Sequence, residues 1–473
     1  MNDLASHGYD RFTEPHAARR AAFACMVTLA VTLGIGRFAF TPLLPLMLHG
    51  SALGQPQLDI QHGGWLASFN YAGYFAGALS CAALRVEPAR MVRVGLVATV
   101  LLTLAMGVTH HFWVWAAVRF IAGAVSAWTF VFASQWGLRR LAELGAHGWS
   151  GVIYTGPGVG IVGTGVLVSV AGGFGATAGW IWFGLIGAVL SAAVWPVFRG
   201  AVGVGGEGAD RRGRGSVADV DAGRNGTSRS SNRHAAVSER SANQPAVSGP
   251  PVGQSHASQR AASQLAGGRT TGHITGHTAH RADAIWLILL YGIPGFGYII
   301  TATFLPVIAR HALPGSFWPD LFWPMFGAAL IVGALLGARL PVHWDNRTLL
   351  AGCYVLQAMG IALGIVWPTA GGFSLGSMLI GLPFTAITLF AMREARRLRG
   401  DDAAGLMGYA TAAYGVGQIV GPLVAAPIAD HTGSFSPALW LAAGALMVGA
   451  AGLIAVAHRP QPHRDRMPDC SCN

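Results

Sequence analysis

The chain has 473 residues, of which 52% are hydrophobic and only 11% are charged. Soluble domains carry about 25% charged residues, so this composition excludes a soluble globular protein and indicates one that crosses a membrane many times. The basic residues are all arginine, and the net charge of +11 therefore has to be interpreted from where these arginines lie.

Apolar runs long enough to span a bilayer recur along the whole chain. We predict twelve such spans, at residues 21–48, 63–84, 91–109, 112–137, 150–171, 177–198, 284–308, 318–340, 347–367, 370–392, 404–429 and 435–457. The pattern predicts an all-α polytopic membrane protein with two six-helix halves, residues 21–199 and 284–458.

The segment between the halves, residues 200–283, differs sharply in composition from the spans. It is rich in Gly, Ser, Ala and Arg and has almost no large apolar side chains. Such a segment cannot bury enough surface to offset the entropy cost of ordering, so we predict a disordered linker. Residues 1–20 and 459–473 are predicted to be polar terminal segments.

The arginines are distributed asymmetrically about the predicted spans. Twenty-eight of the 31 fall in the termini, the linker and alternate loops, whereas one, Arg310, falls in an opposite loop and two, Arg37 and Arg119, lie within spans. Positively charged loops stay in the cytoplasm, so both termini and the linker are predicted to be cytoplasmic. The positive charge then reflects orientation and contact with the lipid bilayer, and we expect no nucleic-acid partner.

The most informative span is the first, because an arginine lies near its middle. Gly34-Ile35-Gly36-Arg37-Phe38 continues into Thr41-Pro42-Leu43-Leu44-Pro45. A central arginine costs about 2.5–3.5 kcal/mol on insertion scales, and its guanidinium cannot lose its proton. We therefore expect Arg37 to face water, a counter-ion or a ligand in a polar cavity, where weakened helix hydrogen bonding is tolerated.

The same stretch is echoed in the first span of the second half. Its two glycines and second proline recur at Gly295, Gly297 and Pro306, each 261 positions after 34, 36 and 45. Repeats of this kind build many transporters, with the binding site at the interface between repeats. Tyr298 holds the repeat position of Arg37, so an approximate two-fold axis predicts that it lies across the cavity from Arg37.

Several motifs resemble those of a known transporter family. The stretches that carry the resemblance are Gly34 to Pro45, Gly64 to Tyr74, Arg119 to Gly123, Tyr291 to Pro306 and Gly417 to Pro422. Together with the six-plus-six layout they resemble the YbfB/YjiJ-type branch of the major facilitator superfamily. The resemblance covers all twelve spans, and it implies a monomeric, multi-pass transporter of the bacterial cytoplasmic (inner) membrane.

In the fold of that superfamily, the first and fourth spans both border the central cavity. Arg119 lies about seven residues into the fourth span, and we therefore consider Arg37 and Arg119 as a dual anchor for an anionic substrate such as a carboxylate. The alternative for Arg119 is that its guanidinium bonds to helix-end carbonyl groups. Asn70, Tyr154 and Gln418, with Gln135 and Tyr414, are further polar candidates, for which an interhelical hydrogen bond is an equally good account.

No Asp or Glu lies well inside any predicted span, so a simple proton-symport mechanism through a buried carboxylate is not supported. No nucleotide-binding glycine loop, paired carboxylates or metal-spaced cluster occurs in the spans, and we expect no cofactor, no metal and no enzymatic activity. We predict a secondary active transporter of a small organic solute, and we favour an organic anion as that solute. The alternatives are an efflux pump for drug-like compounds and a membrane sensor or scaffold that uses the linker.

Deleting residues 205–280 separates the transporter from the scaffold. A transporter keeps its activity without the linker, because the linker contributes no side chain to the membrane-embedded site. A scaffold loses its function on the same deletion, even when the truncated protein reaches the membrane in normal amounts. Transport assays on whole cells, paired with immunodetection in membranes, make this measurement.

Overall fold

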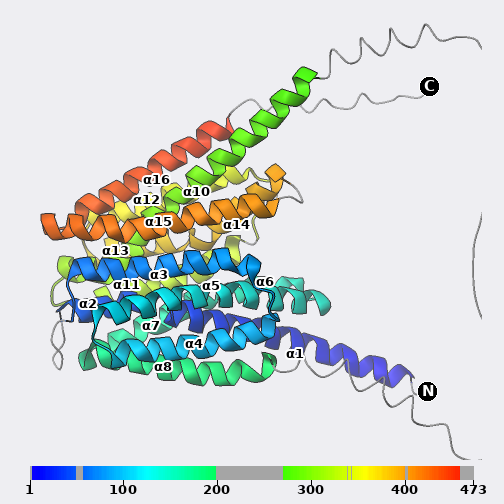
Figure 1. Ribbon diagram of the computed structural model, residues 1–473, viewed down its shortest axis with the longest axis horizontal. Coiled ribbons are helices and arrows are strands. Elements are labelled where there is room, and N and C mark those ends of the chain that lie inside the picture. Colours follow the sequence, from blue (N-terminus) through cyan, green and yellow to red (C-terminus); the bar gives the residue numbers. More distant parts are fainter. Residues whose placement is uncertain are drawn as a thin grey trace, which may run out of the picture. The chain divides into compact units, whose positions relative to one another are not determined.

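The computed structural model describes residues 3–49, 57–198, 270–337, 339–341, 343–399 and 403–458, and the regular secondary structure of these residues is entirely helical (Figure 1). The described residues between 3 and 198 and between 279 and 458 belong to one compact unit. Most of the predicted linker and the tail 459–473 lie outside the described residues.

Both halves contain the predicted succession of helices. The helices of the N-terminal half are α1 (Asp3–Leu29), the π-helix η1 (Ala30–Ile35), α2 (Phe40–His49), α3 (Ile60–Ser80), α4 (Pro88–Val108), α5 (Phe112–Glu143), α6 (Ser150–Ile153), α7 (Gly156–Ala171) and α8 (Gly175–Val194). Short 3₁₀ turns follow at η2 (Cys81–Ala83), η3 (His147–Trp149), η4 (Gly172–Phe174) and η5 (Trp195–Phe198). The C-terminal half holds α10 (Thr270–Ala312), α11 (Pro319–Gly337), α12 (Asn346–Val366), α13 (Ala370–Gly381), α14 (Phe384–Arg399), α15 (Ala403–Thr432) and α16 (Ser436–Ala457).

The predicted all-α polytopic fold is confirmed. Eleven helical segments of the described chain are long and apolar enough to cross a membrane, and their ends match the predicted spans to within a few residues, apart from longer polar ends on the first, fourth and tenth. The predicted span 63–84 corresponds to α3, which is 21 residues long but is not apolar enough to count among these eleven segments. Because α3 packs between α5 and α15, polar residues such as Asn70 face protein, and the helix does not need an apolar surface all round.

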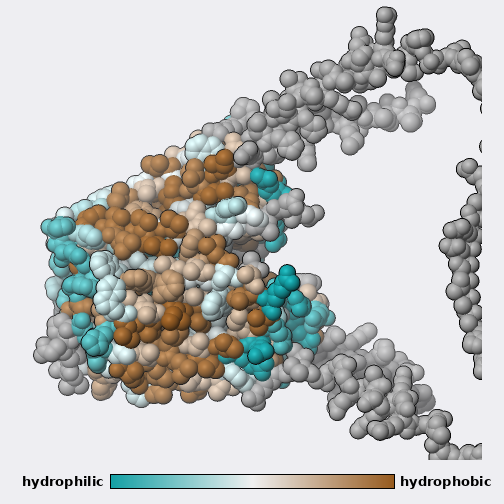
Figure 2. Space-filling view, viewed as in Figure 1, coloured by the Kyte–Doolittle hydropathy of each residue, from teal (hydrophilic) through white to brown (hydrophobic). Residues whose placement is uncertain are grey.

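The helix ends define two faces of this unit. We call the end near Ser80, Glu143 and Ala457 the termini face, and the end near His49 and Val108 the loop face. Figure 2 shows apolar side chains over the middle of the helices and hydrophilic ones gathered toward these two ends. This distribution is the one a membrane-spanning bundle requires.

The contacts between the halves follow a reciprocal pattern. α3, the second span, packs against α15, the eleventh, while α11, the eighth, packs against α7, the fifth. The second helix of each half thus meets the fifth helix of the other, as a two-fold relation between the halves demands. The α7–α11 contact is close because a Cβ at Gly165 would overlap the ring of Pro324, and one at Gly158 would crowd the carbonyl of Gly327.

A buried arginine joins four helices at the termini face of the C-terminal half. Arg347 is only 5% exposed. It donates to Glu394 on α14 at 2.7 Å, to Asp283 on α10 at 2.7 Å and to the carbonyl of Val456 on α16 at 3.0 Å. Two carboxylates therefore compensate this cation, and its role is structural.

Substitutions at glycine test how tightly α3 and α5 pack. A Cβ at Gly73 would overlap the backbone carbonyl of Phe120, so Gly73→Ala should force the two helices apart. We expect a loss of about 1–3 kcal/mol, measured as a lower midpoint of thermal unfolding in detergent. The matched control is Gly163→Ala on α7, where a Cβ meets nothing within 4 Å. It should unfold at the parent temperature or slightly above, since Ala favours helix over Gly; equal stability of the two variants would contradict the packing described.

Candidate functional site

The first span is interrupted immediately before Arg37. In η1 the amide of Gly36 donates to the carbonyl of Val31 and that of Phe38 to Leu33, so five residues separate donor and acceptor. The amide of Thr41 then bonds to Phe38, and Pro42 has no N–H to donate. The carbonyls of Gly36 and Arg37 are consequently left free of the ordinary helical pattern.

The glycines of this stretch permit close approach of other helices to the interruption. A Cβ at Gly34 would overlap the backbone of Gly160 on α7, and one at Gly36 would crowd the side chain of Thr99 on α4. The spacing Gly34-Ile35-Gly36 therefore fixes where the broken segment sits against α4 and α7.

Arg119 on α5 supplies the hydrogen bonds that the broken helix lacks. Its Nη1 donates to the carbonyl of Gly36 at 3.3 Å and its Nη2 to the carbonyl of Arg37 at 3.2 Å. The side chain is 2% exposed, and its guanidinium lies 4.7 Å from the centre of the Phe40 ring. Of the two alternatives for Arg119, the observed contacts are those with backbone carbonyls, which leaves the predicted dual anchor with Arg37 alone.

Arg37 points into the interface between the halves. Its Nη2 donates to Oε1 of Gln418 on α15 at 3.0 Å, and the residue is 6% exposed. Aromatic faces surround the guanidinium: the ring centres of Tyr74, Tyr71 and Phe38 lie 4.1, 5.1 and 5.2 Å from Cζ. Cation–π attraction stabilises the charge by about 2 kcal/mol when such a pair is desolvated.

No carboxylate compensates Arg37 within the described chain. The ion pairs there involve His62, Arg140, Arg310, Arg347 and Arg397, but neither Arg37 nor Arg119. The contrast with Arg347 is direct, because that equally buried cation has two acidic partners. Arg37 thus presents a positive charge that no acidic side chain among residues 3–49, 57–198, 270–337, 339–341, 343–399 and 403–458 neutralises.

Gln418 connects Arg37 to a wall of tyrosines in the C-terminal half. Its Nε2 donates to the hydroxyl of Tyr298. Tyr298, which holds the repeat position of Arg37, is therefore linked to Arg37 through Gln418. The rings of Tyr298 and Tyr414 stack at 5.9 Å and 20°, and those of Tyr414 and Tyr291 at 5.0 Å and 25°. The structure therefore brings together three of the predicted site residues: Arg37, Tyr298 and Gln418.

The other two predicted site residues bond elsewhere. Asn70 donates to the backbone carbonyl of Arg119 at 2.8 Å, which ties α3 to α5. Tyr154 packs its ring on that of Phe130, with 6.2 Å between the ring centres, within a separate core cluster of the N-terminal half. These contacts give both residues packing roles, and we do not assign them to the site.

Sequence reasoning did not single out Tyr71, Tyr74 and Tyr291, which complete the aromatic surroundings. Tyr71 and Tyr74 were available within the motif Gly64 to Tyr74, spaced three apart and therefore on one face of α3. A buried arginine without an acidic partner is the signal that would have directed attention to tyrosines on neighbouring helices.

Hydrogen bonds between the halves cluster on the loop-face side of Arg37. Thr41 donates to the carbonyl of Ala302 at 2.9 Å, and the hydroxyls of Tyr71 and Thr303 lie 3.1 Å apart. Nearer the termini face, Figure 2 shows the described surface hollowed between the halves. Hydrogen bonds thus join the halves on the loop-face side of Arg37.

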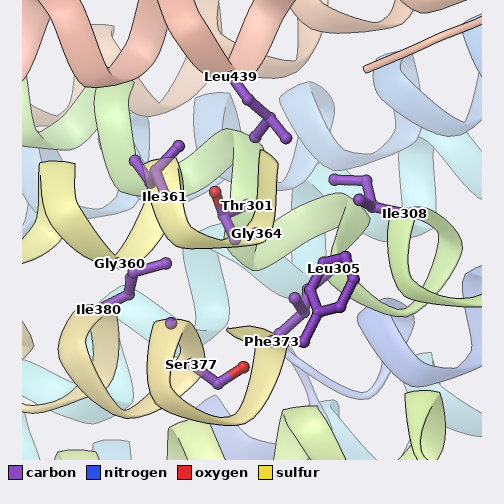
Figure 3. A pocket seen from close by; sticks show the side chains of 11 residues that line it. Thr301, Leu305, Ile308, Gly360, Ile361, Gly364, Phe373, Ser377, Ile380 and Leu439 are labelled. Atoms are coloured by element: carbon purple, nitrogen blue, oxygen red, sulfur yellow. The ribbon is translucent and has the colours of Figure 1, made fainter. Parts of the chain in front are cut away.

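A small cavity in the C-terminal half lies apart from this site (Figure 3). It measures about 20 Å³, and apart from Thr301 and Ser377 its lining consists of apolar side chains and glycines. The hydroxyls of Thr301 and Ser377 have no hydrogen-bond partner. Its volume suits one water molecule and excludes an organic substrate, so it does not compete with the Arg37 site.

Comparison with known proteins adds the context of a family. The model of the family described as "Uncharacterised MFS-type transporter YbfB" matches residues 29–209 and 259–455. A chloramphenicol resistance protein of Streptomyces lividans is 31% identical over 216 residues, which are 41% of this chain and 51% of that protein. The chain thus spans about half the length of this curated relative.

Solved structures show the same fold. A crystal structure of a mutant of the nucleoside transporter NupG has a TM-score of 0.61 at 14% identity and covers 93% of this chain and 99% of its own. A second crystal structure of NupG has a TM-score of 0.57 at 13% identity and covers 94% and 100%. At this identity the similarity concerns the fold alone.

Replacing Arg119 tests whether its two hydrogen bonds stabilise the broken first span. Arg119→Leu removes two charged donors and leaves the carbonyls of Gly36 and Arg37 unpaired in the bundle, at a cost of about 1–3 kcal/mol each. We expect a clearly lower thermal midpoint in detergent, and a smaller drop for Arg119→Lys, which keeps the charge but loses the two-pronged geometry. A leucine variant as stable as the parent would show that these hydrogen bonds do not hold the segment.

Proposed function

We propose a substrate class and a mechanism on the premise that this chain belongs to the family of uncharacterised MFS-type transporters represented by YbfB. Family and fold make it a multi-pass membrane protein that transports a small molecule. Within that function, we propose secondary active transport of a small organic anion by alternating access, with the substrate held near the bilayer midplane between the two halves.

The observation that carries this proposal is the uncompensated charge of Arg37. Burying an unpaired ion costs several kcal/mol, and the part of the chain that the structure describes offsets that cost for Arg347 with two carboxylates but supplies none for Arg37. An anionic substrate is the partner that such a site favours, because a carboxylate matches the planar fork of a guanidinium. A cationic substrate would add a third positive charge beside those of Arg37 and Arg119.

The walls of the site support an anion with a flat organic body. Both halves offer ring faces and hydroxyls around the guanidinium. They belong to Tyr71 and Tyr74 on α3 and to Tyr298 and Tyr414 in the other half. Ring faces pack well against planar groups, and hydroxyls accept or donate hydrogen bonds at their edges. We propose that Arg37, Tyr298 and Gln418 line the substrate-binding site, with Arg37 as the group that binds the anion and Tyr71, Tyr74 and Tyr414 beside them.

The distribution of arginines supports an orientation. Among the arginines whose side chains the structure describes, thirteen lie at the termini face and one, Arg310, at the loop face: the thirteen are Arg19, Arg20, Arg85, Arg90, Arg93, Arg139, Arg140, Arg339, Arg347, Arg393, Arg396, Arg397 and Arg399. We propose that the termini face is cytoplasmic, in the inner membrane of a bacterium. The hydrogen bonds on the loop-face side of Arg37 would then close the site toward the outside.

A second candidate is the export of a drug-like compound. The similarity to the chloramphenicol resistance protein favours it, although that similarity covers 41% of this chain. The aromatic walls would serve such a compound as well, but the charge of Arg37 would then have no function in binding.

Uptake by reconstituted vesicles separates the candidates. Using labelled benzoate as a planar carboxylate probe within a panel of organic acids, we expect Arg37→Gln to raise the half-saturating concentration about 30-fold or more, because losing one partner of a buried charge pair costs about 2 kcal/mol or more. The matched control is Arg140→Gln, since Arg140 is exposed at the termini face and pairs only with Glu143. This control should transport like the parent protein.

The contrasting outcome points to export. If no acid is transported and expression of the chain protects cells against chloramphenicol equally with Arg37 and with Gln at position 37, the anion proposal fails and the second candidate stands. Uptake assays with and without a pH gradient also report whether protons accompany the substrate.

A further inference from the structure

We infer that Gln418 is an internal stand-in for the carboxylate of the substrate: in the empty carrier its amide oxygen occupies the place on Arg37 that a substrate oxygen takes. This inference rests on the proposed anion transport and adds to it a mechanism of competition. The substrate class that it implies is an organic carboxylate able to displace a neutral amide from a guanidinium.

The contacts of Gln418 fix which end of its amide faces Arg37. A guanidinium has donors only, so the group opposite its Nη2 at 3.0 Å must be the amide oxygen. The amide nitrogen then faces the hydroxyl of Tyr298, which accepts its hydrogen bond. Gln418 therefore presents to Arg37 the one atom that resembles a carboxylate oxygen.

Gln418 satisfies only one of the two hydrogen-bond donors that Arg37 presents in the same direction. The Nε–H and one Nη2–H of an arginine point in the same direction and form a two-pronged donor. Here Nη2 is bonded to Gln418, whereas Nε is buried and has no hydrogen-bond partner among the residues that the structure describes. One amide oxygen satisfies one prong, but a carboxylate has two oxygens and a negative charge and satisfies both.

Displacing Gln418 also breaks a link between the halves. Arg37 belongs to the first span and Gln418 to α15, so their hydrogen bond joins the two halves beside the substrate site. A neighbouring bond between the halves runs from Ser68 on α3 to the carbonyl of Ile419 on α15 at 2.9 Å and does not involve Arg37. A carboxylate that replaces the amide would leave this neighbouring bond in place, so the two contacts can be tested separately.

The first experiment needs no ligand. Gln418→Glu places a real carboxylate opposite Arg37, and we expect the thermal midpoint in detergent to rise by at least about 2 °C. In the Arg37→Gln background the same change should give no rise, because the glutamate then has no cation. A midpoint that falls by the same amount in both backgrounds would overturn the inference, since residue 418 would then not occupy an anion position on Arg37.

The second experiment measures binding of benzoate to the purified protein in detergent. Gln418→Ala removes the competitor and should lower the half-saturating concentration about tenfold, which corresponds to ~1.4 kcal/mol, whereas Gln418→Glu should raise it at least about tenfold. Ser68→Ala is the matched control, because it removes only the adjacent inter-half bond, and it should leave the value unchanged.

The outcomes separate this inference from the proposed function. If benzoate binding depends on Arg37 but Gln418→Ala weakens it, Gln418 is an ordinary substrate ligand and the stand-in role is refuted. If Ser68→Ala changes binding as Gln418→Ala does, the bond of Gln418 acts only by joining the halves, which also refutes it. If no acid binds, anion transport fails, and the thermal comparison with and without Arg37 alone decides whether residue 418 occupies an anion position.

Discussion

A guanidinium inside a membrane protein keeps its charge, so the surrounding structure has to compensate it. This chain does so in three ways. Arg347 receives two carboxylates and a backbone carbonyl, and Arg119 receives two carbonyls of a broken helix. Arg37 receives one amide oxygen and the faces of aromatic rings, which are weaker partners than a carboxylate. The first two arrangements stabilise the fold, whereas the third leaves a cation able to gain from a ligand.

The break in the first span links two of these arginines. Because η1 and Pro42 disrupt the helical pattern, carbonyls become available to Arg119, and Arg119 in turn fixes the backbone from which the side chain of Arg37 projects. Close packing at Gly34 and Gly36 holds the same segment against α4 and α7. Arg37 is therefore part of a rigid N-terminal half rather than a side chain on a mobile loop.

Much of this arrangement can be predicted from the sequence, and there are definite physical reasons why the rest cannot. The spans were predictable because apolar runs end at charged or helix-breaking residues, and α3 was the least apolar because protein covers its polar face. The cost of burying Arg37 and the repeat position of Tyr298 identified two members of the site. Backbone carbonyls were an expected alternative for Arg119, but that they belong to Gly36 and Arg37 was not predictable, since these carbonyls are free only where the backbone leaves the helical pattern. Nor was the bond between Arg37 and Gln418, which are 381 residues apart and belong to different halves.

The position of the site between the halves has a thermodynamic consequence for the proposed carrier. In this proposal Arg37 moves with one half, and Tyr298 and Tyr414 move with the other, so opening the protein on either side draws one set of contacts away from a bound solute. Such a solute is held most tightly while both walls enclose it, midway through its passage, and less tightly in each open form. Affinity measured from either side of the membrane then underestimates the strength of the complete site, and the difference drives closure around the cargo.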